Sequence, residues 1–305
     1  MRFRILLAFF IGFQVFALQG QTYVQVLGTV QDAGAPHIGC LKPCCENRFE
    51  NHSNSWLVSS IGIIDQDRAY VVDATPDFTL QLKNLFDGAG FLDKRQPDGI
   101  FLTHAHIGHY TGLMYLGREA LGAKHVPVYT MPRFKTFLES NGPWSQLVSL
   151  GNIRLQTMQN EKWLSISDSI KIQPILVPHR DEYSETVGFL IQGPKKKMLF
   201  IPDIDKWSTW KYSINDFIEQ VDYALIDATF FSAAEVSGRS ISEIPHPLVE
   251  ESIHLFQSLS KTDKSKIYFI HMNHTNPMLD VGSSTYDYVH ENGFNIATLN
   301  QKLDL

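Results

Sequence analysis

The sequence predicts an α/β sandwich in which two mixed β-sheets pack against each other and helices flank them. Short apolar runs rich in β-branched residues alternate with segments of helical periodicity. Two pairs of these runs are joined by tight turns, at residues 65–67 and at Gly193-Pro194, as in antiparallel hairpins. Hairpins mixed with helices favour mixed sheets. No Gly-x-Gly-x-x-Gly sequence follows an expected strand, as a doubly wound nucleotide-binding fold would need.

The expected elements follow in order after residue 20. Strands are β-branched or apolar runs between turn residues, and they are predicted at residues 23–30, 56–64, 68–73, 99–103, 170–177, 186–192, 197–201, 223–227 and 266–270. Helices are predicted where apolar residues recur at helical spacing, at residues 78–86, 109–120 and 247–259. No repeat or low-complexity linker separates these elements, so we expect one domain over residues 21–305.

The first twenty residues differ from the rest of the chain. Two arginines precede the apolar residues 5–18, and a polar stretch resumes at Gln21. This pattern is typical of a secretory signal peptide, which we expect to cover residues 1–20 and to be cut near Gly20. The apolar run is shorter than the ~20 residues of a full membrane span, so an uncleaved anchor is the alternative. We expect an exported protein, periplasmic or secreted, without a stable membrane span after cleavage.

The composition argues against nucleic-acid binding. The net charge is −6, and the only basic run is residues 195–197, which lie in an expected hairpin turn. A nucleic-acid partner needs a basic surface, so we expect a small-molecule substrate instead. The composition gives no indication of an oligomeric state.

Three cysteines lie close together near the start of the expected domain. An odd number leaves at least one thiol unpaired, and the adjacent Cys44 and Cys45 would form a strained bridge. Structural zinc sites use such sets of soft and borderline ligands. Two interpretations stay open: free or partly disulfide-linked cysteines, or a structural metal held by His37, Cys40, Cys44 and Cys45.

The strongest chemical signal is the segment Thr103-His104-Ala105-His106-Ile107-Gly108-His109. It lies where an expected strand meets an expected helix. His104 and His106 are two residues apart, so on extended backbone they face the same side, and His109 lies in the first helical turn. Imidazole binds zinc, iron and nickel well. The cluster therefore predicts a metal site, with a chance group of surface histidines as the alternative.

This segment and the residues after it resemble the metallo-β-lactamase superfamily signature Thr-His-x-His-x-Asp-His-x-x-Gly-Leu. The resemblance implies an αββα sandwich and metal-dependent hydrolysis, with Zn as the cofactor in one or two ions and Fe or Mn as alternatives. Further landmarks of the family follow expected strands in the family's order. Asp73 resembles the aspartate that braces the histidine loop, which is residues 104–109 here. The implied metal ligands are His104, His106, His109, His179, Asp203 and His271.

Within this superfamily the chain resembles the PqqB-like branch, which is related to phosphodiesterases and tRNA-processing nucleases. The resemblance lies in Leu27-Gly28-Thr29 with Gly34-Ala35-Pro36 and the cysteines, in Asp227-Ala228-Thr229-Phe230 and in residues 271–277. Two departures argue against a role in PQQ synthesis itself: the chain keeps both His104 and His106, and it begins with an expected signal peptide.

A third departure concerns the metal ligands. Gly108 stands where the family has an aspartate that helps to bind the second ion. Glycine offers no ligand, so we expect the second ion to bind more weakly than the first. Asp181 and His274 are candidates to compensate. As alternatives, Asp181 pairs with an arginine and His274 caps a turn.

The resemblance implies metal-assisted hydrolysis, possible because a bound ion lowers the pKa of its water from 15.7 to about 7. Asp203 would orient the water or accept its proton. His246 resembles the substrate-side histidine of the nuclease branch and would protonate the leaving group, unless it is a surface residue at a helix start. The expected substrate is a phosphodiester or other ester. The alternatives are a PqqB-like oxidative protein that uses iron, a lactamase or other amide hydrolase, and a non-enzymatic metal-binding protein.

Overall fold

The computed structural model describes residues 21–50, 56–236 and 245–305. The expected signal peptide, residues 1–20, lies outside the described residues. Among the helices that are described, none combines the length and the apolar character that a membrane crossing requires.

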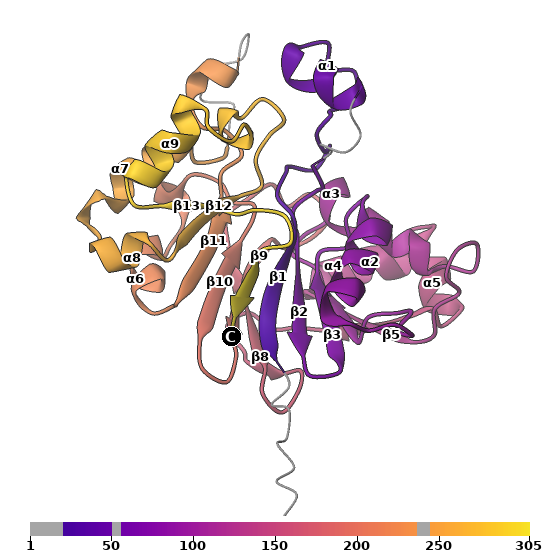
Figure 1. Ribbon diagram of the computed structural model, residues 1–305. Coiled ribbons are helices and arrows are strands. Elements are labelled where there is room, and N and C mark those ends of the chain that lie inside the picture. Colours follow the sequence, from indigo (N-terminus) through magenta and orange to yellow (C-terminus); the bar gives the residue numbers. More distant parts are fainter. Residues whose placement is uncertain (1–20, 51–55, 237–244) are drawn as a thin grey trace, which may run out of the picture.

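Two seven-stranded sheets form the centre of the molecule (Figure 1). The first sheet has the order β14 (Lys302–Asp304), β1 (Thr22–Gly28), β2 (Ser60–Asp65), β3 (Arg68–Val72), β4 (Gly99–Phe101), β5 (Val126–Thr130) and β6 (Ile153–Thr157). The second has the order β13 (Asn295–Ile296), β12 (Ile267–Ile270), β11 (Tyr223–Asp227), β10 (Lys197–Ile201), β9 (Val187–Gln192), β8 (Lys171–Leu176) and β7 (Leu164–Ser165). Each sheet contains parallel and antiparallel pairs, so the predicted mixed sheets are confirmed.

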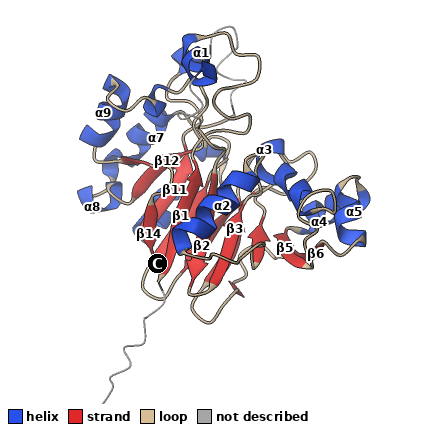
Figure 2. Cartoon of the chain, turned by 45° about the vertical axis from the view of Figure 1, so that its right-hand side comes forward, coloured by secondary structure: helices blue, strands red, loops and turns tan. Residues whose placement is uncertain are grey.

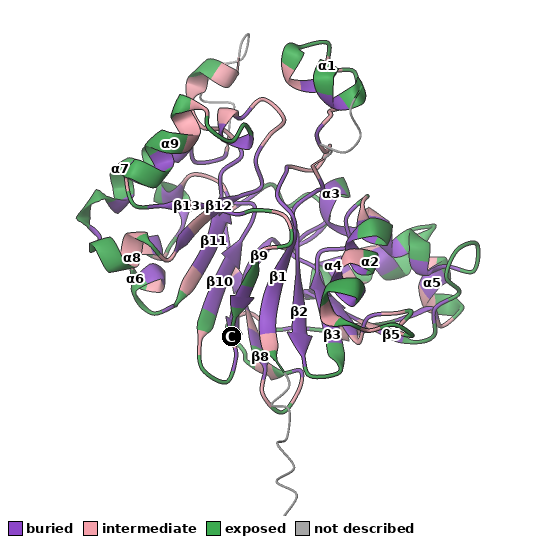
Figure 3. Cartoon of the chain, in the orientation of Figure 1, coloured by how far each residue is buried: buried purple, intermediate pink, exposed green. Residues whose placement is uncertain are grey.

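Helices flank the two sheets on their outer sides (Figure 2). The helices are α1 (Pro43–Glu50), α2 (Phe78–Ala89), α3 (Ile107–Tyr110), α4 (Pro132–Ser140), α5 (Trp144–Ser149), α6 (Ile214–Glu219), α7 (Val249–Leu255), α8 (Lys261–Lys264) and α9 (Ser284–Glu291). One apolar cluster fills the space between the sheets, with Val26 and Ile63 from the first sheet and Phe189 and Phe200 from the second. Two further clusters join each sheet to its own helices, and Figure 3 shows the buried strands between exposed helix faces.

The predicted helix at residues 109–120 is wrong in its length. The structure has only the short α3, which continues as a 3₁₀ helix at Thr111–Leu116. The amide of Gly112 donates to the carbonyl of Ala74, 2.9 Å away and outside the helix. A Cβ atom at position 112 would lie 2.1 Å from the carbonyl oxygen of Thr75. The histidine loop is therefore packed tightly against the segment that follows β3, and this contact interrupts α-helical geometry.

The ends of five strands place polar side chains at one edge of the sandwich. β3 and β4 are parallel, and so are β10, β11 and β12. Parallel neighbours end at the same edge of a sheet, where α/β proteins gather functional groups. Asp73 and His271 each follow a strand directly, and the backbone φ angles of these two residues are positive, at 68° and 67°. Non-glycine residues rarely adopt this backbone conformation, and such strain is concentrated at functional sites.

Candidate metal centre

A first group of side chains converges at this edge from β4, β8 and β10. Its potential ligand atoms all lie within 4.8 Å of one another, and its members are His104, His106, His179 and Asp203. Asp203 Oδ2 lies 3.2 Å from His104 Nε2 and 3.2 Å from His179 Nε2. His106 Nδ1 lies 2.9 Å from His104 Nε2 and 3.2 Å from His179 Nε2. His179 therefore lies on the same edge as the histidine loop.

Other carboxylates hold the histidine loop and His179 in place. Asp73 is fully buried, and it accepts hydrogen bonds from the Thr103 amide at 2.8 Å and the Thr103 hydroxyl. Its Oδ2 also lies 2.7 Å from His109 Nδ1. Asp205, which sequence reasoning missed, lies 3.0 Å from His179 Nδ1. A carboxylate on one ring nitrogen leaves the other free to face the centre, as in many metal sites.

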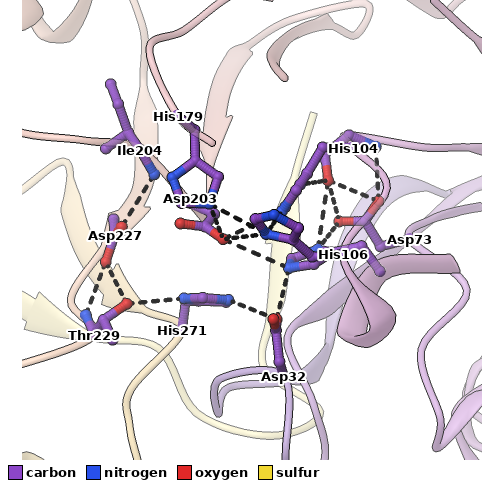
Figure 4. Close-up of polar contacts among 12 residues, drawn as sticks. Asp32, Asp73, His104, His106, His179, Asp203, Ile204, Asp227, Thr229 and His271 are labelled. Atoms are coloured by element: carbon purple, nitrogen blue, oxygen red, sulfur yellow. Dashed lines mark hydrogen bonds and ion pairs between the residues drawn. The ribbon is translucent and has the colours of Figure 1, made fainter. Parts of the chain in front are cut away.

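A second group lies beside the first and shares Asp203 with it (Figure 4). Its potential ligand atoms satisfy the same 4.8 Å limit, and its members are Asp32, His109, Asp203 and His271. Asp32 Oδ1 lies 2.9 Å from His109 Nε2 and 3.5 Å from His271 Nε2. The hydroxyl of Thr229 lies 3.0 Å from His271 Nδ1, on the side away from Asp32. Sequence reasoning missed Asp32, because it follows no strand directly and belongs to no motif that we recognised.

Several atoms that face this space have no hydrogen-bond partner among the described residues. They are Asp32 Oδ1, His109 Nε2, Asp203 Oδ1 and His271 Nε2, and all are buried. Buried polar atoms are nearly always satisfied, so each exception needs an explanation. Their close distances without hydrogen-bond alignment indicate that the atoms point at a common centre and not at one another. The arrangement and the imidazole and carboxylate donors fit a divalent transition-metal ion.

The electrostatics favour anionic carboxylates in both groups. Burial by itself would raise the pKa of Asp203, but His179 and His246 hold that pKa well below its usual value. Burial likewise opposes ionisation of Asp32, and His109 and His271 nevertheless keep its pKa well below the usual value. Burial disfavours charge on His109, yet Asp73 and Asp32 raise its pKa well above the usual value. A metal ion competes with protons for such ligands.

His246 lies at the centre and not on the surface, with 8% exposure. Its Nδ1 lies 2.9 Å from Asp227 Oδ2 and 3.2 Å from Asp203 Oδ1. Burial disfavours the charged ring, but Asp227 and Asp203 together raise the pKa of His246. Asp227 is itself fixed by the amides of Ile204 and Thr229, at 3.1 and 2.8 Å. The ring is therefore positioned beside the carboxylate that the two groups share.

The three cysteines form a separate cluster with His274 and not with His37. This cysteine cluster consists of Cys40, Cys44, Cys45 and His274. His274 Nδ1 lies 3.6 Å from Cys44 Sγ and 3.4 Å from Cys45 Sγ, and no disulfide joins the three thiols. His37 packs its ring on that of His274 at 4.5 Å, and its Nδ1 faces the carbonyl of Ile38. Burial and the neighbouring Cys45 raise the pKa of Cys44 to about 12.

The two residues proposed to compensate for Gly108 lie elsewhere. His274 belongs to the cysteine cluster, although it follows His271 by only three residues. Asp181 is exposed, and its carboxylate lies 3.0 Å from the guanidinium of Arg133. Asp181 is absent from every group of potential metal ligands that the described residues form.

A cavity of about 300 Å³ opens beside the two groups, since both Asp32 and His106 line it. Its other walls come from the histidine loop and the loop after β8, and they are Ala105, Ile107, Tyr110, Arg180, Glu182 and Tyr183. The size lies at the lower end of the ~300–1,000 Å³ typical of ligand pockets. The cavity gives a small molecule access to the centre.

Comparisons with known proteins identify the family. Residues 68–272 match the β-lactamase superfamily domain. The chain belongs to this family. It is 26% identical to coenzyme PQQ synthesis protein B of Methylococcus capsulatus, over 90% of this chain and 97% of that protein. The resemblance to the PqqB-like branch of the metallo-β-lactamase superfamily is thereby confirmed.

Solved structures show the same fold. Zn(2+)-bound PqqB from Methylobacterium extorquens superposes with a TM-score of 0.78 at 20% identity, over 93% of this chain and 100% of that one. A diphosphatase from the PhnP family superposes with a TM-score of 0.63 at 19% identity, over 93% and 97%. The predicted αββα sandwich of this superfamily is confirmed.

Proposed function

We propose that the protein is a metal-dependent hydrolase that activates water on one or two zinc ions. The observation that carries the proposal is the pair of ligand groups that share Asp203. The first ion would be held by the three histidines of the first group, and the second by His109 and His271, with Asp203 common to both. A bound divalent ion lowers the pKa of its water to about 7 and polarises a carbonyl or phosphoryl oxygen.

The chain's own residues supply positioning and proton transfer. Asp203 Oδ2 lies between His104 and His179, where the carboxylate can accept a hydrogen bond from an attacking water. His246 is fixed through Nδ1 by Asp227, and its position beside Asp203 suits a donor to the leaving group. The geometry therefore supports roles for both residues, and it favours an active-site His246 over a surface one.

We propose that the substrate is a small molecule with an anionic ester, and a phosphodiester is the first candidate. Arg180 and Tyr183 line the cavity beside the two groups, and a guanidinium suits a phosphate or carboxylate. The diphosphatase of similar fold supports a substrate that carries phosphate. The similarity to PQQ synthesis protein B keeps an oxidative function with iron as the second candidate. The complete set of three histidines in the first group favours the hydrolase.

We also propose that the cysteine cluster binds a structural zinc ion. Three thiols and one imidazole match the ligand sets of structural zinc sites.

The basic start and apolar residues 5–18 support export to the periplasm or the exterior. The mass of the mature protein tests the export proposal, because cleavage near Gly20 removes residues 1–20.

The test of function combines metal content with a substrate panel. Protein purified from its native compartment is assayed on phosphodiesters, lactams and thioesters before and after chelation, and after zinc is restored. We expect phosphodiester hydrolysis to follow the zinc content. His246→Asn should lower kcat by ~10²–10⁴-fold, the range for a general acid, with zinc content unchanged. Asp181→Asn, which alters an exposed carboxylate outside the groups, is the matched control.

Three outcomes would overturn the proposal. Iron as the native metal with oxygen consumption would favour the oxidative candidate. Hydrolysis of lactams alone would indicate an amide hydrolase. A fully metal-loaded protein that cleaves no member of the panel would indicate a binding function.

A further inference from the structure

Glycine occupies position 108 for a steric reason that the sequence does not reveal. A Cβ atom at position 108 would lie 2.4 Å from Oδ1 and 2.5 Å from Cα of Asp32. Real Cβ atoms essentially never approach other heavy atoms so closely. The φ angle of Gly108 lies outside the positive range, so the backbone conformation does not require glycine. Asp32 occupies the space that an aspartate side chain at position 108 would need.

Asp32 also faces the same two histidines that such an aspartate would accompany. Its Oδ1 contacts the Nε2 atoms of His109 and His271 at 2.9 and 3.5 Å. The side chain is 12% exposed, and Oδ1 is buried without a hydrogen-bond partner in the described part of the chain. The other carboxylate of the second group is Asp203.

Backbone pairing fixes Asp32 in register with His271. The amide of Gln31 donates to the carbonyl of Met272, and the amide of Met272 donates to the carbonyl of Thr29, both at 2.9 Å. Asp32 directly follows one end of this ladder, and His271 directly precedes the other. The loop after β1 therefore delivers the carboxylate to the end of β12 as reliably as a strand would.

We propose that Asp32 is a carboxylate ligand of the second metal ion and that glycine at position 108 leaves the space that the Asp32 side chain requires. This proposal rests on the metal centre described under the proposed function. The second ion then has two imidazoles and two carboxylates from four separate segments. The expectation that the second ion binds more weakly rested on a missing carboxylate, and the structure places a carboxylate there. Restoring an aspartate at position 108 is expected to damage the site.

The experiment titrates metal-free protein with zinc by calorimetry and counts the bound ions by elemental analysis. The unmodified chain should bind two ions at the centre and one at the cysteine cluster. Asp32→Asn keeps the shape of the side chain and removes its charge, and Asp32→Ala removes both. Each should lower the affinity of one ion by more than ~10-fold, because losing even an outer partner of a ligand costs 10–100-fold. Asp181→Asn is the control and should change nothing.

Gly108→Ala and Gly108→Asp separate a ligand role from a merely structural one. Gly108→Ala removes no ligand, yet its methyl group must displace Asp32 and should weaken the same ion as Asp32→Asn. Gly108→Asp should do so as well and should not tighten the site. Circular dichroism and melting of the metal-free variants show whether each still folds.

The outcomes distinguish this proposal from the proposed function. If the unmodified chain binds no ion at the centre, the proposed function fails. If it binds two ions there and Asp32→Asn binds both with unchanged affinity, only the assignment of Asp32 is wrong. A Gly108→Asp variant that binds the second ion more tightly would also overturn the assignment.

Discussion

The two ligand groups of the centre are built in different ways. The first takes two histidines from one short segment after β4, with a third after β8. The second takes one residue from each of four segments, including the loops after β1 and β12. A motif with close spacing can be recognised in a sequence, whereas a site assembled from remote loops depends on tertiary packing. The second group is therefore the half that is harder to recognise in a sequence.

The two groups also differ in what surrounds them. Asp32 and His271 lie eight and three residues before members of the cysteine cluster, Cys40 and His274. Arg48 strengthens this connection by donating to the carbonyls of Cys44 and His274, at 2.7 and 3.3 Å. The first group has no member so close in sequence to the cysteine cluster. A change in the cysteine cluster should consequently affect metal binding in the second group more than in the first.

The largest effect is expected for Asp203→Asn, because both groups contain this residue. Both ions should be lost and hydrolysis should fall to the level of the metal-free protein. An ion present at 100 times its Kd stabilises the fold by about 2.7 kcal/mol, so zinc should raise the melting temperature of this variant far less. The matched control is Asp205→Asn, which removes a contact to His179 of the first group and should weaken only the first ion. Retention of both ions by Asp203→Asn would show that Asp203 is not the ligand that the two groups share.

A smaller effect is expected for Asp73→Ala, which removes no ligand. Asp73 contacts the Thr103 amide ahead of His104 and the Nδ1 atom of His109, so it supports both groups. Outer partners of this kind contribute 10–100-fold in metal affinity, about 1.4–2.7 kcal/mol. Zinc titration of the variant measures the loss for each ion. Unchanged occupancy at limiting zinc would count against a bracing role.

The sequence predicted the fold and the residues of the first group better than those of the second. The two hairpins and the mixed sheets followed from local apolar patterns, and His104, His106 and His179 came from a motif and its family order. The 3₁₀ geometry after α3 depends on the contact between Gly112 and Ala74, which no local pattern reports. Asp32 was missed for the same reason, since its position depends on the pairing of Thr29 and Gln31 with Met272. His274 was one candidate to compensate for Gly108, and its place in the cysteine cluster depends on tertiary packing that the sequence does not report.

The smallest effect is expected for Cys44→Ser, and it distinguishes the two groups most directly. Cys44 belongs to neither group, but its thiol lies 3.6 Å from His274 Nδ1 in the cluster whose members Cys40 and His274 follow Asp32 and His271 in the sequence. Loss of the proposed structural zinc should loosen those loops and weaken the second ion about fivefold, at the low end of couplings between sites. The first ion should be unaffected, because its histidines lie on other strand ends. Calorimetric titration with zinc measures both, and Arg133→Ala, which removes an exposed contact to Asp181, is the control. Equal weakening of both ions would mean that the cysteine cluster supports the whole fold and has no selective connection to the second group.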